Sequence, residues 1–138
     1  MKEVAVRLKR ETGFPIVSIC NSPIRWMKSD YNYYDVSVEE FIGFYHNASY
    51  IVSASFHGVA MGLVFEKPVY AMVKAKRANR IKEVMQLFGL DKFIVSEDES
   101  LNLRPYNEEA INNLITIKKQ KIEESLGFLK RMLSNEND

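Results

Sequence analysis

The chain has 138 residues, which is the size of one domain and enough to bury a core. Its 19 basic and 18 acidic residues nearly cancel, so no overall field points to a nucleic acid as partner. The longest apolar run, 59–65, is too short to span a bilayer, and we expect no transmembrane segment. The single cysteine excludes an internal disulfide and favours a reducing, cytoplasmic setting.

The first third of the chain predicts a helix and a strand. Apolar spacing favours an amphipathic helix over about 2–12, ended by Gly13, and then a buried strand over 14–20. We expect residues 21–36 to be irregular. Their aromatic and basic side chains either fold this loop onto the domain, which we favour, or stack on a sugar or nucleotide. Because a domain rarely opens with such a helix, we expect an earlier strand and an earlier domain.

The middle of the chain alternates helices and strands. Ser37 and Glu40 form a capping box that starts a helix ending near residues 46–47. A strand over 50–53, a helix over 58–65 and a strand over 69–73 follow, and Pro68 separates the last two.

The last third predicts a helix over about 81–88, stopped by Gly89, and a short strand over 93–95. After an acidic link, a long helix runs over about 107–133 and a polar tail ends the chain. This order of elements predicts right-handed crossovers and a parallel sheet. The fold class is therefore α/β, a Rossmann-like three-layer domain that spans residues 1–138.

The segment Ser53-Ala54-Ser55-Phe56-His57-Gly58 is the main candidate site, because it joins a strand to a helix. Such turns lie at the carboxyl edge of a parallel sheet, and the helix N-terminus there attracts anions. The hydroxyls of Ser53 and Ser55 can donate to anionic oxygens, and His57 can donate or shuttle a proton. Gly58 lets a ligand approach the backbone. An equally simple alternative is structural: Ser55 caps the helix, and His57 bonds a neighbouring loop.

A basic cluster follows the next strand, with Lys74, Lys76, Arg77 and Arg80 within seven residues. It should lie at the same edge of the sheet as the turn. Arg80 can hold a phosphate or carboxylate with two parallel hydrogen bonds, whereas Lys76 and the other cations add positive field or are simply solvated. The two histidines have no metal-ligand spacing, so we expect neither a metal nor a cofactor.

Three spans of the chain resemble the C-terminal part of the polysaccharide pyruvyl transferase family. They are 37–42 with Asn47-Ala48, 51–60 with 65–69, and 79–81 with 87–90. The Ser-Phe-His-Gly core at residues 55–58 is the most specific of these signals. The resemblance implies the second half of a two-domain arrangement similar to GT-B glycosyltransferases, without the first strand of that half. It also implies an active cleft whose other wall belongs to an N-terminal domain.

Members of that family move the enolpyruvyl unit of phosphoenolpyruvate onto sugar hydroxyls and release phosphate. The resemblance therefore implies phosphoenolpyruvate as donor and a glycan or lipid-linked sugar as acceptor, in the cytoplasm or peripherally at the inner face of the membrane. His57 matches the family's active-site histidine, as a proton donor or as a phosphate ligand. Arg80 matches an arginine after the last central strand. Lys92 departs from the family, which often has arginine there.

Two other functions remain open on the sequence. The first is half of a GT-B glycosyltransferase that uses a nucleotide sugar, although no acidic residue for a ribose is obvious. The second is a non-catalytic remnant or interaction module. Because a missing strand would expose sheet surface, we also expect a tendency to pair with another copy of the chain.

Overall fold

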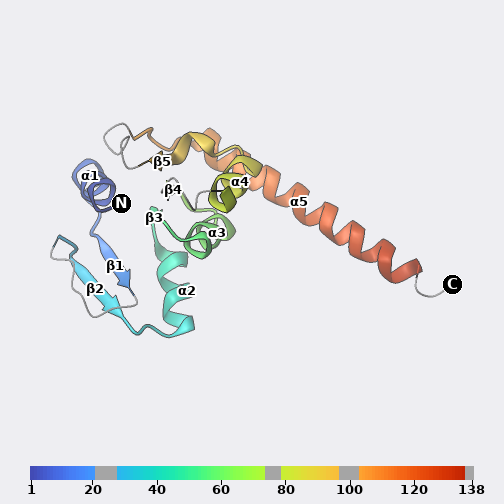
Figure 1. Ribbon diagram of the computed structural model, residues 1–138, viewed down its shortest axis with the longest axis horizontal. Coiled ribbons are helices and arrows are strands. Elements are labelled where there is room, and N and C mark those ends of the chain that lie inside the picture. Colours follow the sequence, from blue (N-terminus) through green and yellow to red (C-terminus); the bar gives the residue numbers. More distant parts are fainter. Residues whose placement is uncertain (21–27, 74–78, 97–102, 136–138) are drawn as a thin grey trace.

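The computed structural model describes residues 1–20, 28–73, 79–96 and 103–135, which form an α/β fold (Figure 1). Its centre is a parallel sheet in the order β3-β4-β5, made of β3 (Ile51–Ser53), β4 (Val69–Val73) and β5 (Ile94–Ser96). All five residues of β4 are buried. A central parallel strand is covered on both faces, which explains the unbroken apolar run.

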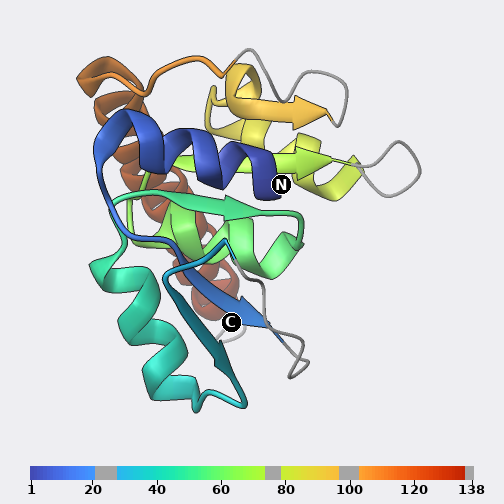
Figure 2. The ribbon, with the colours of Figure 1, turned by 90° about the vertical axis from the view of Figure 1, so that its left-hand side faces the viewer.

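Helices cover both faces of this sheet. In Figures 1 and 2, α1 (Lys2–Thr12) lies on one face, and α3 (Phe56–Val64) and α4 (Asn79–Leu87) lie on the other. Val4 and Leu8 anchor α1 in the core, and Gly13, with a φ of 75°, ends the helix as predicted. The α/β class, the parallel strands and the layered arrangement predicted from the sequence are therefore confirmed.

The strand predicted over 14–20 differs from expectation in its burial and its partner. It forms β1 (Val17–Cys20), which pairs in parallel with β2 (Tyr31–Tyr34) in a second, two-stranded sheet. Val17 is 41% exposed, so the prediction of a buried strand was wrong. The physical reason is that, within the described residues, β1 pairs on one edge only and lies apart from the central sheet (Figure 2).

The prediction of an irregular segment over 21–36 was also wrong in part, because β2 lies inside it. The Tyr33 ring packs on Phe44, with 4.8 Å between the ring centroids, and so ties this segment to the domain. Tyr33 therefore supports the structural interpretation of the aromatic residues. Residues 21–27, which include Trp26, lie outside the described part of the chain.

The capping box at Ser37 is confirmed at the start of α2 (Val38–Asn47). The hydroxyl of Ser37 accepts from the backbone N–H of Glu40 at 3.2 Å, and the Glu40 carboxylate accepts from the N–H of Ser37 at 2.8 Å. The helix ends at Asn47, where the sequence predicted it to end.

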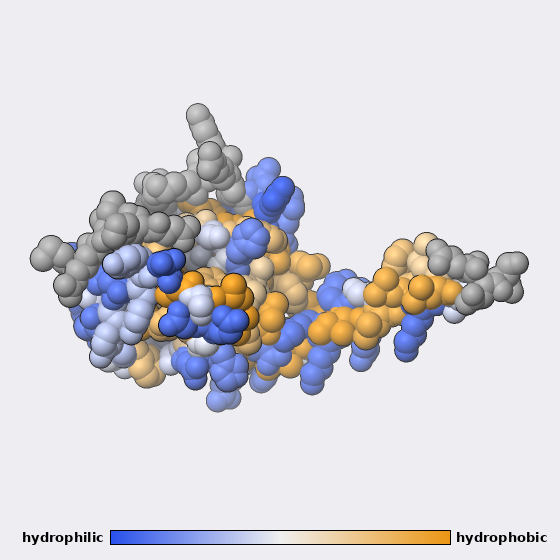
Figure 3. All heavy atoms as spheres, turned by 90° about the horizontal axis from the view of Figure 1, so that it is seen from below, coloured by the Kyte–Doolittle hydropathy of each residue, from blue (hydrophilic) through white to orange (hydrophobic). Residues whose placement is uncertain are grey.

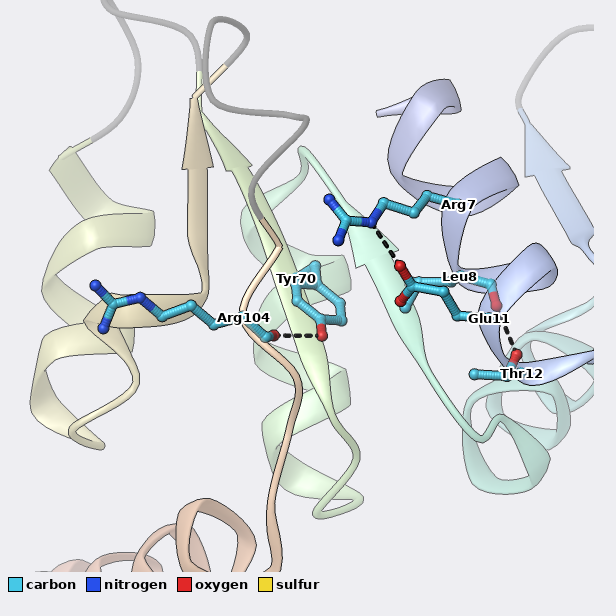
Figure 4. A network of polar contacts seen from close by, with 6 residues as sticks. All are labelled: Arg7, Leu8, Glu11, Thr12, Tyr70 and Arg104. Atoms are coloured by element: carbon cyan, nitrogen blue, oxygen red, sulfur yellow. Dashed lines mark hydrogen bonds and ion pairs between the residues drawn. The ribbon is translucent and has the colours of Figure 1, made fainter.

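An aromatic cluster closes the core beside β4. Phe93, in the short helix η1 (Asp91–Phe93), stacks on Tyr106 with 3.6 Å between the ring centroids. The Tyr70 hydroxyl donates to the carbonyl of Arg104 at 2.7 Å, as Figure 4 shows, with the Arg7–Glu11 ion pair of α1 nearby. Burial raises the pKa of Tyr70 to about 12.

The long C-terminal helix α5 (Glu108–Asn135) begins in the core and ends away from it (Figure 1). Ala110 and Leu114 are buried against the body. The second half extends outward with one apolar side in Figure 3, and its exposed residues include Ile122, Leu126, Phe128, Leu129, Met132 and Leu133. The helix continues slightly beyond the predicted end near 133. Among the described residues, no helix has the length and apolar character needed to cross a membrane.

Candidate functional site: the turn from β3 into α3

The predicted turn is tighter than the sequence indicated, because α3 begins at Phe56 rather than at residue 58. Ser55 occupies the N-cap position with extended backbone angles, φ −99° and ψ 137°. Serine is a favoured residue at this position, and no proline or glycine delays the helix before residue 58. His57 and Gly58 consequently belong to the first turn of α3, and only Ala54 and Ser55 separate strand from helix.

Ser53 holds this turn together from the end of β3. Its side chain is buried, and its Oγ accepts from the backbone N–H of Ser55 at 3.1 Å. The same hydroxyl contacts the Ser55 carbonyl oxygen at 3.4 Å, to which it can donate. Ser53 therefore positions the turn. A direct contact between Ser53 and a bound anion stays a prediction.

Gly58 is buried, and its missing side chain makes room for neighbours inside the protein. A Cβ atom on Gly58 would lie 2.2 Å from the Ser53 Oγ and 2.9 Å from the hydroxyl oxygen of Tyr45. Gly62, one turn later, is equally tight, since its Cβ would lie 2.5 Å from a methyl group of Val69. Glycine at both positions lets α3 approach β3 and β4 closely, which fixes the height of the turn above the sheet.

Tyr45 is a site residue for which the sequence predicts only a place on the apolar face of a helix. It reaches from α2 to the first turn of α3, where its hydroxyl lies beside Ser53 and Gly58. Burial raises its pKa, so the phenol stays neutral at physiological pH. The spacing of Gly58 and Gly62 is the one sequence signal for this packing, because two glycines one helical turn apart allow a close approach.

His57 and Ser55 face outward at the start of the helix. His57 is exposed, and its ring meets the ring of Phe56 edge-on at 5.9 Å without a hydrogen bond to any described residue. The Ser55 side chain is exposed and makes no capping hydrogen bond. The alternative in which Ser55 caps the helix and His57 bonds a neighbouring loop is therefore not seen among the described residues. Within this part of the chain, both side chains are available to a ligand.

The backbone adds donors at the same point. The helical ladder of α3 starts with the Val59 N–H, which donates to the Ser55 carbonyl at 3.0 Å. The N–H groups of Phe56, His57 and Gly58 precede it and have no partner within the helix. At the other end of α3, the Lys118 amine donates to the Val64 carbonyl at 2.7 Å, which complements the negative end of the dipole.

Arg80 lies at the start of the neighbouring helix. It is the second residue of α4 and is exposed. Because β3 and β4 are parallel neighbours, with Ser53 opposite Ala71, the helices that follow them start at the same edge of the sheet (Figure 2). The topology thus brings His57 and Arg80 to one edge. Lys76 and the rest of the basic cluster, residues 74–78, lie outside the described part of the chain.

Fold and turn together define an α/β protein with polar and basic side chains at the carboxyl edge of a parallel sheet. Comparison with known families gives the assignment: the family model for polysaccharide pyruvyl transferase matches residues 1–73, slightly more than half of the chain, and the chain belongs to this family. The matched residues contain the whole turn, whereas Arg80 lies beyond them. Comparisons with curated proteins and with solved structures gave no match.

Proposed function

We propose that this chain is the donor-binding half of an enzyme that transfers the enolpyruvyl unit of phosphoenolpyruvate to sugar hydroxyls of a polysaccharide. The observation that carries the proposal is the exposed His57 in the first turn of α3, beside N–H groups that have no partner within the helix, in a chain of a transferase family. A phosphorylated carboxylate such as phosphoenolpyruvate needs donors and cations at one point, and this edge of the sheet supplies them.

The reaction places three demands on the protein: a proton donor for the methylene carbon, a cation that binds the phosphate or carboxylate, and hydrogen-bond donors for the charge that develops on the leaving phosphate. A proton adds to the methylene carbon of phosphoenolpyruvate, and the electron-deficient carbon that results takes the oxygen of a first sugar hydroxyl. The bond from that carbon to the phosphate oxygen then breaks, phosphate leaves, and a second hydroxyl closes the ketal. Each of the two sugar hydroxyls releases a proton. One of these protons replaces the proton that was added to the methylene carbon, and the other leaves with the phosphate or passes to solvent.

Each demand has a candidate in this chain. His57, as an imidazolium, either protonates the methylene carbon or binds the phosphate. Arg80 binds the phosphate or carboxylate through its planar guanidinium. The N–H groups at the start of α3 and the Ser55 hydroxyl stabilise the developing charge on the leaving group. Lys76 adds positive potential.

The acceptor side of the reaction requires residues from elsewhere. We propose that residues 1–138 are the C-terminal, Rossmann-like domain of a GT-B-type arrangement, and that an N-terminal domain supplies the acceptor wall of the cleft. The acceptor would be a glycan or lipid-linked sugar of an envelope or exported polysaccharide, reached in the cytoplasm or at the inner face of the membrane. On this account, the 138-residue chain alone binds the donor and shows little or no turnover.

The test is calorimetric titration of the chain with phosphoenolpyruvate. His57→Ala and Arg80→Ala should each weaken binding about tenfold, because a hydrogen bond to a charged group contributes roughly 1.5–3 kcal/mol and solvent screening reduces this at an exposed site. The matched controls are His46→Ala, at the far end of α2 where the ring packs on Phe65, and Arg131→Ala on the outer part of α5. Both should bind like the parent chain.

A second titration, with UDP-glucose, addresses the alternative of a nucleotide-sugar glycosyltransferase. Tighter binding of UDP-glucose, lost in the same two variants, would replace the proposal by that alternative. Binding of neither compound by a folded chain would favour a non-catalytic module. Equal losses in the control variants would show that the effect is not specific to this edge of the sheet.

A further inference from the structure

The outer half of α5, residues 119–135, carries an apolar side that lies exposed. The preceding part of the helix is anchored, because Leu114 is buried in the core. The Lys118 amine then donates to the Val64 carbonyl at 2.7 Å and to the Glu66 carboxylate at 2.8 Å. Beyond Lys118 the helix leaves the body (Figure 1), and one side of it is apolar along its length (Figure 3). Four large residues on this side are each 48–64% exposed: Ile122, Leu126, Leu129 and Leu133.

The spacing of these four residues, which we call the α5 stripe, is that of a coiled-coil seam. They follow one another at intervals of four, three and four residues, and this alternation keeps one line of side chains facing a partner helix. The small side chain of Ser125 leaves a hollow beside the stripe, which a large side chain of a partner helix can fill. The hollow is lined by Glu124, Ser125, Phe128 and Leu129. The α5 stripe therefore fits another apolar helix.

An antiparallel pairing with a second copy of α5 buries the whole stripe. If Leu126 of one copy lies opposite Leu129 of the other, the two-fold axis also places Ile122 opposite Leu133, so all four positions are paired. In this register, the end of the second α5 comes level with a point just beyond Lys118. The two Lys118 residues, where each helix leaves its body, are then about 30 Å apart along the helix axes. The bodies consequently lie at opposite ends of the pair and do not collide.

The charges beside the α5 stripe favour the antiparallel direction. Glu123 and Lys130 each follow a stripe residue directly, so both lie on the same flank of the helix. The two-fold axis brings these flanks together and places Glu123 of each copy within about 3 Å, along the axis, of Lys130 of the other. Two attractive pairs result. In a parallel pair, the flank with Glu123 would instead meet the flank with Lys118 and Ser125. There Lys118 is already paired with Glu66.

We propose that the outer half of α5 binds a second copy of this chain as an antiparallel helix pair, with the α5 stripe at its centre and Glu123–Lys130 ion pairs on its flank. Two short helices bury less than the about 1,600 Å² of a typical stable interface, so the dimer forms reversibly, at micromolar concentrations or above. The proposal rests on α5 alone. It depends neither on the proposed reaction nor on the pairing through sheet surface that the sequence analysis expects.

The test is sedimentation equilibrium of the 138-residue chain over a range of concentrations. The parent chain should dimerise reversibly, and Leu126→Lys should weaken the dimer by about a hundredfold or more, because pairing would bury two lysines. Since Leu126 is exposed, the thermal midpoint of the dilute monomer should not change. Lys130→Glu should weaken the dimer about tenfold, because two attractions become repulsions. Its matched control is Arg131→Glu, the same change of charge on the side of α5 away from the stripe, which should leave the dimer unchanged.

A charge exchange tests the direction of the pair. The double variant Glu123→Lys, Lys130→Glu should dimerise like the parent chain, because the exchanged residues still attract each other across the two-fold axis. In a parallel pair, a lysine at position 123 would face Lys118, so the dimer would not be restored and the antiparallel arrangement would be overturned. A chain that stays monomeric up to millimolar concentration would overturn the proposal, and so would a dimer that Leu126→Lys leaves intact. Binding of a monomeric chain to vesicles of anionic lipid, lost in Leu126→Lys, would replace the second copy by a membrane surface.

Discussion

Gly58→Ala is the substitution that tests the architecture of the turn most sharply. The added Cβ would lie 2.2 Å from the Ser53 Oγ and 3.0 Å from the Ser53 Cβ. Ser53 cannot simply rotate away, because its hydroxyl holds the Ser55 N–H at 3.1 Å. Overpacking of this kind costs about 1–3 kcal/mol, whereas alanine gains up to about 1 kcal/mol over glycine in a helix. We therefore expect a net loss of roughly 1–2 kcal/mol.

Urea unfolding of the variant and the parent chain measures this loss. The matched control is Gly43→Ala in the middle of α2, where a Cβ would meet nothing within 4 Å. There the helix propensity acts alone, and we expect a gain of about 0.5–1 kcal/mol. In a double-mutant cycle, Ser53→Gly should remove most of the cost of Gly58→Ala, because it removes the Oγ and Cβ of Ser53 and leaves only the Tyr45 hydroxyl, 2.9 Å away, in close contact. Equal stabilisation by the two alanine substitutions would refute the close approach of α3 to β3.

Three further predictions concern the elements around the site. Gly62→Ala should destabilise the chain by about 1–3 kcal/mol in the same urea assay, because its Cβ would lie 2.5 Å from a Val69 methyl group. Ser37→Ala should cost about 1 kcal/mol, because the first turn of α2 loses its capping bond, and Ser37→Asp should restore most of it. The pKa of Tyr70 is raised from 10.0 to about 12, because burial favours the neutral phenol. The contribution of this phenol to the free energy of unfolding is therefore complete below pH 10 and is lost between pH 10 and 12. Alkaline unfolding of Tyr70→Phe should lack about 2–3 kcal/mol of that pH dependence, and an unchanged profile would contradict the burial of the phenol.

Local signals in the sequence were enough for most elements of the fold. Ser37 with Glu40 and the stop at Gly13 each involve neighbours a few residues apart, and the structure has both as predicted. The buried strand β4 could be predicted just as directly, because a strand that is covered on both faces is apolar throughout. Burial and pairing of β1 could not be derived in this way. They depend on which strand lies beside β1, and its partner β2 lies in a segment that the sequence predicted to be irregular.

In the candidate site, too, the sequence indicated the features that depend on neighbouring residues and not those that depend on tertiary contacts. The sequence located the turn and its exposed side chains, His57 and Ser55, from the strand-to-helix transition alone. It missed Tyr45, whose place beside Gly58 depends on how α2 packs against α3. It also explained Gly58 by ligand approach, whereas the close contacts of that glycine are with Ser53 and Tyr45. Tertiary contacts of this kind leave only weak traces in a single sequence, here the spacing of two glycines.

The anion site at the start of α3 can be tested directly with the two histidines of the chain as paired reporters. The NMR signals of the His57 and His46 rings are recorded while phosphoenolpyruvate is added, and His46→Ala assigns them. We predict a saturable shift of the His57 signals with little change at His46, which packs on Phe65 away from the turn. The same shift should disappear in Arg80→Ala. Unchanged His57 signals at millimolar phosphoenolpyruvate, or equal shifts of both rings, would contradict an anion site at the start of α3.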